Sequence, residues 1–108
     1  MRLSVSPLAS RQIRSIYAYV AHDNLQAATK VVARIGEVAK FVAANPGAGR
    51  ATLVPDVRAF PANPYPYVIY FRKLRDEVRI VRVLHAAQRR PGLREEGPVY
   101  LAELAQAR

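Results

Sequence analysis

The sequence contains no cysteine and no tryptophan, and it has two histidines and a single methionine. Without cysteine the chain has no disulfide framework, no thiolate ligand for a metal and no cysteine nucleophile. Two histidines are too few for an all-histidine metal site, so we expect neither a metal nor a cofactor. Any chemistry on this chain must come from arginine, histidine, tyrosine or carboxylate side chains.

Acidic residues and long apolar runs are also scarce. Eight Asp and Glu stand against seventeen Lys and Arg, which gives a formal net charge of +9. A surface this cationic favours a polyanion or an acidic protein as partner. No stretch approaches the ~18 apolar residues of a membrane span, and the N-terminus lacks the apolar core of a secretory signal. We therefore expect a cytoplasmic protein, and 108 residues suffice for one compact domain.

The first predicted elements are a short strand and an amphipathic helix. Leu3 and Val5 alternate with polar residues, as in a strand over residues 1–5. Ser6-Pro7 is a typical helix start, because serine caps an unpaired N–H and proline at the first helical position loses no bond. A stripe at helical spacing follows, made of Ala9, Ile13, Ile16, Tyr17 and Val20. We expect Tyr17 in the core and Tyr19, which lies off the stripe, on the surface.

A second helix follows after a very short break. Its apolar stripe matches the helical template over four turns and consists of Ala28, Val31, Val32, Ile35, Val38, Ala39 and Val42. Asp23 and Gln26 have the spacing of a capping pair, so the helix is predicted to start near Asn24. Asn45 precedes Pro46 and ends it near Ala44. The break at residues 22–24 predicts an antiparallel helical hairpin.

From residue 50 onward, β-branched and aromatic runs are punctuated by prolines. Residues 53–60, 65–74 and 78–84 have the composition of three strands. The short charged connection at residues 73–77 suits a hairpin between the last two. The predicted order is therefore β-α-α-β-β-β, an α+β fold.

The charge is concentrated near the end of this region. Residues 72–94 contain eight basic and two acidic residues. Strict strand alternation predicts one face with Val78, Ile80, Arg82 and Leu84 and another with Arg79, Val81, Val83 and His85. Burying an unpaired arginine is costly, so Arg82 should reach a cleft, a carboxylate or the rim of the sheet. A solvated hairpin whose charges discourage aggregation explains the pattern equally well.

Six segments, in this order, carry a resemblance to a known family. They are Ser6-Pro7-Leu8-Ala9, Ile16-Tyr17-Ala18-Tyr19-Val20, Pro46-Gly47-Ala48-Gly49-Arg50, Val57-Arg58, Tyr65-Pro66-Tyr67-Val68-Ile69-Tyr70 and Ile80-Val81-Arg82-Val83-Leu84-His85-Ala86-Ala87. Together they resemble the ParE branch of the ParE/RelE superfamily of bacterial toxin–antitoxin toxins. The likeness covers residues 1 to about 90. The family usually has Gly, Ala and Arg after the histidine, whereas Ala86-Ala87-Gln88-Arg89 stand here, so Arg89 or Arg90 replaces the usual arginine.

The resemblance implies a fold and a biological role. The fold is a toxin domain over residues 1–90, with a twisted antiparallel sheet packed against the N-terminal two-helix hairpin. The role is a toxin held inactive by a cognate acidic antitoxin in a hetero-oligomeric complex. ParE-like members inhibit DNA gyrase and stabilise its cleaved DNA complex, while RelE-like relatives cut mRNA on the ribosome.

The residues favour binding over catalysis. Ribonuclease chemistry needs a base, an acid and cations for the developing charge. In this alternative His85 transfers a proton, Arg82 stabilises charge and Tyr70 stacks on a base or donates a proton. His22 lies at the tip of the helical hairpin, and residues 50–70 contain no Lys or Glu, so a second proton-transfer group is missing. We therefore predict an inhibitor without catalytic residues; a decayed member that binds its antitoxin but poisons nothing is a third reading.

Two sets of binding residues follow from this prediction. The expected target-binding residues are Arg58, Arg82, His85, Arg89 and Arg90, and the expected antitoxin-binding residues are Tyr19, Arg72 and Arg79. The antitoxin groove is expected on the sheet face without helices or on the outer side of the hairpin, where an acidic amphipathic peptide folds on binding. A lone histidine at the end of an apolar strand, such as His85, is more often structural.

The tail over residues 91–108 lies beyond the family pattern. It begins with Pro91-Gly92 and contains Gly97-Pro98, and Tyr100, Leu101, Leu104 and Ala105 have the spacing of one short amphipathic helix. Three alternatives are open for this tail: it covers the sheet, it extends the antitoxin contact, or it is disordered.

Overall fold

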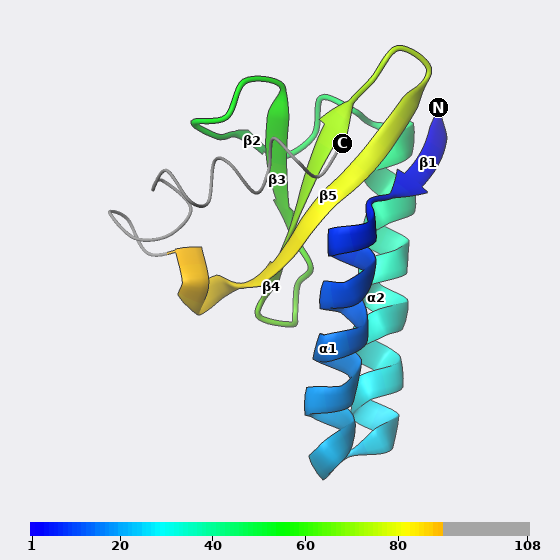
Figure 1. Cartoon of the computed structure of the whole chain (residues 1–108), viewed down its shortest axis with the longest axis vertical. Helices are drawn as coiled ribbons and strands as arrows, with labels where there is room; N and C mark the ends of the chain where they lie inside the picture. The colour runs from blue at the N-terminus through cyan, green and yellow to red at the C-terminus, as the bar shows by residue number, and fades with distance from the viewer. Residues whose placement is uncertain (90–108) are drawn as a thin grey trace.

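The protein is a five-stranded sheet with a pair of long helices against one face (Figure 1). Its computed structural model describes residues 1–89. The elements are β1 (Arg2–Val5), α1 (Pro7–Asp23), α2 (Leu25–Ala44), β2 (Arg50–Ala51), β3 (Val57–Pro61), β4 (Tyr67–Lys73), β5 (Glu77–His85) and the 3₁₀ turn η1 (Ala86–Arg89). The strand order in the sheet is β1-β5-β4-β3-β2. The predicted α+β class and the order of helices and strands are confirmed.

The sheet differs from the prediction in two details. β1 runs parallel to β5, so the sheet is mixed, while β2 to β5 pair antiparallel in succession. The strand predicted over residues 53–60 begins only at Val57. The reason is a turn in which the hydroxyl of Thr52 donates to the carbonyl of Val57 at 2.9 Å and Asp56 has a φ of 66°. The two residues before this turn form the short β2.

Side-chain caps fix where both helices begin. The Oγ of Ser6 accepts a hydrogen bond from the N–H of Ala9 at 3.1 Å, as predicted for this helix start. The hydroxyl of Ser6 also donates to the carbonyl of Val81 at 3.2 Å, which ties the helix to β5. Asn24, rather than Asp23, caps α2, because its Oδ1 accepts from the N–H of Ala27 at 3.0 Å. The backbone N–H of Asn24 also donates to the carbonyl of Val20 and caps the end of α1. Asn24 is therefore both the C-cap of α1 and the N-cap of α2.

The main core lies between α2 and the sheet. We call it the helix-side core; its buried members are Ala9, Val31, Ile35, Val38, Ala39, Val42, Ala43, Ala62, Tyr67, Ile69, Phe71, Val78, Ile80 and Val83. The predicted stripe of α2 is buried throughout except for half-buried Val32. On α1 only Ala9 is buried, because this helix packs chiefly along α2 and the edge of β5. The core prediction for Tyr17 is therefore wrong, since 38% of it is exposed, while Tyr19 is 79% exposed as expected.

Gly36 offers a simple gain in stability. It lies in the interior of α2, and a Cβ placed there meets no atom within 4 Å. Gly36→Ala is therefore expected to raise the free energy of unfolding by about 1 kcal/mol, because alanine loses less backbone entropy in a helix. The change is measured by urea denaturation.

The matched control is the same substitution at Gly49. This residue has a φ of +76°, and a Cβ there would lie 2.1 Å from the carbonyl oxygen of Ala59. Gly49→Ala is expected to lower the urea midpoint, because the side chain meets strain and backbone overlap together. Equal effects of the two substitutions would contradict this explanation.

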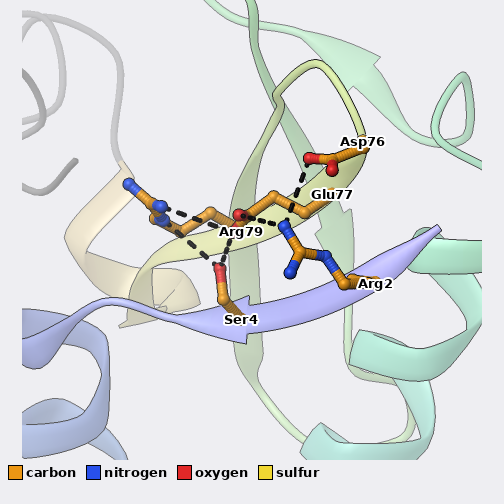
Figure 2. Close-up of polar contacts among 5 residues, drawn as sticks. All are labelled: Arg2, Ser4, Asp76, Glu77 and Arg79. Carbon is orange, nitrogen blue, oxygen red and sulfur yellow. Dashed lines mark hydrogen bonds and ion pairs between the residues drawn. The ribbon is translucent and has the colours of Figure 1, made fainter.

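A polar cluster joins the short β1 to β5 (Figure 2). Nη2 of Arg2 lies 3.3 Å from Oδ1 of Asp76 and 3.5 Å from Oε1 of Glu77. The hydroxyl of Ser4 donates to the carboxylate of Glu77 and accepts from Nε of Arg79 at 3.2 Å. Nη2 of Arg79 lies 3.3 Å from Oε2 of Glu77 and completes the cluster. Glu77 therefore accepts contacts from both strands and fixes the end of the parallel pair.

This arrangement predicts a dependence of stability on pH. The hydrogen bond from Ser4 holds the pKa of Glu77 below its ordinary value of 4.5, with Arg79 and Arg2 acting in the same direction against partial burial. A lowered pKa in the folded state stabilises the fold above the unfolded pKa, and this contribution is lost as the pH falls through the folded pKa. Glu77→Gln is therefore expected to make thermal stability fall less between about pH 5 and pH 3.

The control for this titration is Glu37→Gln. Glu37 pairs with Arg34 at 3.0 Å on the exposed surface of α2, where such pairs contribute little. Melting temperatures followed by circular dichroism across the pH range compare the two variants. An unchanged pH profile for Glu77→Gln would show that the cluster does not stabilise the fold through this carboxylate.

Candidate functional site

A groove with a volume of about 780 Å³ lies between α1 and the last residues of β5. It is lined by Arg11, Gln12, Ser15, Ile16, Tyr19, Val20, Ala27, Val31, Tyr65, Pro66, Tyr67, Arg82, Val83, Leu84 and His85. The name groove is used below for this set. Most of its length follows one side of α1, so the first helix forms one wall and the end of β5 the other.

The groove exists because β1 is shorter than β5. β1 pairs with β5 only from Glu77 to Ile80, so the edge of β5 continues beyond it. Beyond Ile80, side chains from the start of α1 form hydrogen bonds with the backbone of β5. The N–H of Val83 donates to Oε1 of Gln12 at 2.8 Å, and the carbonyl of Val81 accepts from the hydroxyl of Ser6 at 3.2 Å. The helix thus satisfies backbone groups that a neighbouring strand would otherwise pair.

A β-bulge in β5 decides which side chains face the helices. Tyr70 pairs with Arg82 and Phe71 with Ile80, so Val81 is the extra residue. The predicted alternation is therefore wrong beyond Ile80. The helix-side face of β5 carries Val78, Ile80, Val83 and His85, and the other carries Arg79, Val81, Arg82 and Leu84, as the register and the two hydrophobic clusters show. The bulge places Arg82 on the face without helices, where Arg79 already lies by regular alternation.

The groove combines an apolar floor with a polar rim. Val31 and Val83 are buried, and Ile16 and Val20 are half-buried. Arg11, His85 and Tyr19 are exposed. An apolar trough beside cationic groups and an exposed tyrosine fits an amphipathic protein segment that carries acidic residues.

An aromatic pair closes the end of the groove. The rings of Tyr67 and His85 lie 5.4 Å apart in an edge-on arrangement at 84°. Nδ1 of His85 accepts the N–H of Ala87 at 3.0 Å, so a neutral imidazole carries its proton on Nε2. Burial, with a smaller contribution from Tyr19, raises the pKa of Tyr67. The phenol of Tyr67 is therefore a hydrogen-bond donor at neutral pH and not a base.

Two residues of the nuclease alternative, Tyr70 and His85, lie on opposite faces of the sheet. Tyr70 is 1% exposed and lies opposite Arg82 on the face without helices. His85 pairs with Tyr67 on the helix side. His22 lies in the last turn of α1. Within residues 1–89, no group of three or more His, Asp or Glu side chains has a metal-binding arrangement.

Several of the predicted binding arginines have contacts within the domain. Arg58 donates from Nε to the carbonyl of Ala48 at 2.9 Å and from Nη2 to that of Gly49 at 2.7 Å, which fixes the loop between α2 and β2. Arg79 belongs to the polar cluster on β1. Arg72 is 7% exposed and lies opposite Arg79 in the sheet.

The remaining predicted residues divide between the groove and the end of the chain. Tyr19, Arg82 and His85 line the groove together. Arg89 is the last residue of η1, and Arg90 lies outside the described residues. Sequence reasoning missed Arg11, Gln12 and Tyr67. A polar residue beside the apolar stripe of a helix, as Gln12 is beside Ile13, was the available indication.

Comparison with known proteins identifies the family. The family model described as the ParE toxin of type II toxin–antitoxin systems, parDE, matches residues 3–90. The chain belongs to the ParE toxin family. Y4kP of Sinorhizobium fredii (strain NBRC 101917 / NGR234), whose curated name classes it as a toxin, is 39% identical over 83 residues, which cover 77% of this chain and 85% of the relative. A solved structure of the chromosomal ParDE TA system from P. aeruginosa matches with a TM-score of 0.70 at 33% identity, over 79% of this chain and 95% of that one.

The family assignment covers the groove completely. All residues that line it lie between Arg11 and His85, inside the ParE match, whereas residues 91–108 follow its end. Across residues 1–89 of this ParE toxin, neither helix is long and apolar enough to cross a membrane. The groove is thus a feature of the ParE domain itself, built by its helical hairpin and its longest strand.

Proposed function

We propose that this ParE toxin acts by binding: an acidic antitoxin neutralises it, and the toxin inhibits DNA gyrase without breaking a covalent bond itself. The observation that carries the proposal is the groove, which joins an apolar floor to cationic and phenolic groups while His85 stays apart from Tyr70. Such a surface is suited to holding a protein segment. The ParDE system named for the structural relative supports an antitoxin partner.

Charge supports an acidic antitoxin. Seventeen basic and eight acidic residues leave the chain at +9, and opposite charge accelerates the encounter of two proteins. Arg11 stands on the exposed rim of the groove, within reach of carboxylates on a segment that lies in it. A small gene for an acidic partner beside this one, usually upstream, is therefore expected in the genome.

The gyrase target is tested directly with purified protein. Added to a supercoiling reaction, the full chain is expected to stop supercoiling and to leave cleaved DNA. The family resemblance and the position of His85 and Tyr70 on opposite faces of the sheet favour inhibition over nuclease chemistry. Addition of the neighbouring acidic protein is expected to restore supercoiling. The assay measures supercoiled and linear DNA on gels.

Three variants separate target binding from nuclease activity. Arg82→Ala is expected to weaken gyrase inhibition while the circular dichroism spectrum stays unchanged. Arg11→Ala is the control, because it also removes one positive charge but does so on the rim of the groove. Ribosome-dependent mRNA cuts that His85→Ala abolishes, together with normal supercoiling, would replace the gyrase proposal with the nuclease. A protein that binds its antitoxin but leaves both reactions untouched would identify a decayed toxin.

A further inference from the structure

The face of the sheet turned away from the helices is as apolar and as well buried as the helix-side core. We call it the helix-free face; its members are Val57 and Ala59 of β3, Val68 and Tyr70 of β4, and Val81 and Leu84 of β5. Their exposed fractions lie between 0% and 4%. α2 packs against the opposite face of the sheet, and α1 lies beside α2 along β5 (Figure 1).

Little of the ParE domain is available to cover this face. Leu8 and Val54 are the partly buried hydrophobic side chains of residues 1–89 that pack against it. A sheet with two apolar faces needs a layer on each, because its side chains are shielded from water only by packed neighbours. A single leucine and a single valine do not make a layer over three strands, so the near-complete burial of the helix-free face requires cover beyond these two side chains.

We propose that residues 91–108 of the same chain bind the helix-free face and form its cover. The segment follows η1 directly, and η1 continues from β5, which contributes Val81 and Leu84 to the face. Eighteen extended residues span about 60 Å, more than twice the length of the seven-residue β4. The reach and the starting point therefore both suit an intramolecular contact.

The chemistry of the segment complements the face. It contains Leu93, Val99, Tyr100, Leu101 and Leu104, and its acidic residues are Glu95, Glu96 and Glu103. The apolar group matches the six side chains of the face. The register places Arg72 and Arg79 opposite each other and Arg82 opposite Tyr70 on this same face, so carboxylates that arrive with the segment meet guanidinium groups.

The charge of the ParE domain is opposite in sign to that of the segment that follows it. Residues 1–90 hold fifteen basic and five acidic residues, whereas residues 91–108 hold two basic and three acidic ones. The family match ends at residue 90, so this acidic and apolar segment is an addition to a strongly cationic domain.

The test uses the full chain with labelled methyl groups and nuclear Overhauser spectroscopy, which detects protons in direct proximity. We expect cross-peaks from the methyl groups of Val99, Leu101 or Leu104 to those of Val68, Val81 or Leu84. Absence of these cross-peaks, or cross-peaks to Val20 and Val31 in the groove instead, would overturn the proposal. This result does not depend on gyrase or on the antitoxin.

A variant and a mixed sample complete the design. In the full chain, Leu101→Asp with Leu104→Asp is expected to remove the cross-peaks to the helix-free face, while those within the helix-side core, such as Ile35 to Ile69, persist. In a mixture of labelled and unlabelled chains, the cross-peaks should arise within one molecule. Cross-peaks between molecules would identify a second copy as the occupant and would refute the intramolecular contact.

Discussion

Replacing Phe71 by alanine is expected to lower the free energy of unfolding by about 3–5 kcal/mol. Phe71 lies in the middle of β4, is 1% exposed and belongs to the helix-side core with Ile69 and Ile80. Removing the ring forfeits its burial and leaves a cavity that the neighbouring strands cannot fill. Because a domain of this size has about 5–15 kcal/mol in total, the variant is expected to be close to unfolding at 37 °C. Urea denaturation followed by far-UV circular dichroism measures the loss.

Two controls separate burial from aromatic contact. Phe71→Leu keeps most of the volume and is expected to cost less than about 1.5 kcal/mol. Phe41→Ala removes a ring that is 47% exposed and packs against Phe60 in a tilted arrangement with 5.3 Å between the centroids, so a loss of about 1 kcal/mol is expected. A loss at Phe41 equal to that at Phe71 would contradict the ranking by burial.

Local chemistry was sufficient to predict most of the fold. The stripe of α2 and the caps at Ser6 and Asn45 depend on neighbours within one or two turns, so the sequence alone predicts the helical hairpin. The strands of the meander depend on β-branched runs and on the prolines between them. Tyr17 shows the limit of this reasoning, because its position on the stripe predicts burial, while α1 lies along the edge of β5 and leaves 38% of Tyr17 exposed.

The parts that were not predicted depend on contacts far apart in the chain. The direction of β1 follows from its pairing with β5, whose paired residues lie 75 positions further along the sequence. The bulge at Val81 moves Arg82 to the helix-free face, and no local pattern marks it. The loop contact of Arg58 and the cluster around Arg79 likewise need tertiary partners. The number of arginines in the sequence therefore predicts the charge of the domain, but it does not predict which partner each arginine has.

The same limit applies to the groove. Tyr19 was predicted to be exposed because it lies off the apolar stripe, and it is. That it faces Tyr67 and His85 across a hollow depends on β1 ending before β5 does. The lengths of β1 and β5, four and nine residues, cannot be derived from alternation alone. The sequence therefore predicts Tyr19 as a candidate residue, and the structure shows which side chains surround it.

Tyr19→Ala is expected to weaken antitoxin binding about thirty-fold or more, which corresponds to the ~2 kcal/mol of an interface hot spot. Tyrosine on the rim of an apolar groove contributes both area and a hydroxyl to a partner, and Tyr19 is 79% exposed in the free chain. Because so little of it is buried, the substitution is expected to leave the urea midpoint unchanged. Calorimetric titration with the neighbouring acidic protein measures the affinity.

Leu25→Ala is the matched control for this prediction. Leu25 is also a large exposed hydrophobic residue, at 61%, but it begins α2 and does not line the groove. If the antitoxin occupies the groove, Leu25→Ala should change the affinity less than two-fold, since surface contacts outside the centre of an interface contribute little. A larger loss for Leu25→Ala than for Tyr19→Ala would move the antitoxin from the groove to the tip of the hairpin. Because both side chains are exposed, neither substitution is expected to change the stability of the toxin. A difference in affinity between the two variants therefore reports where the antitoxin binds.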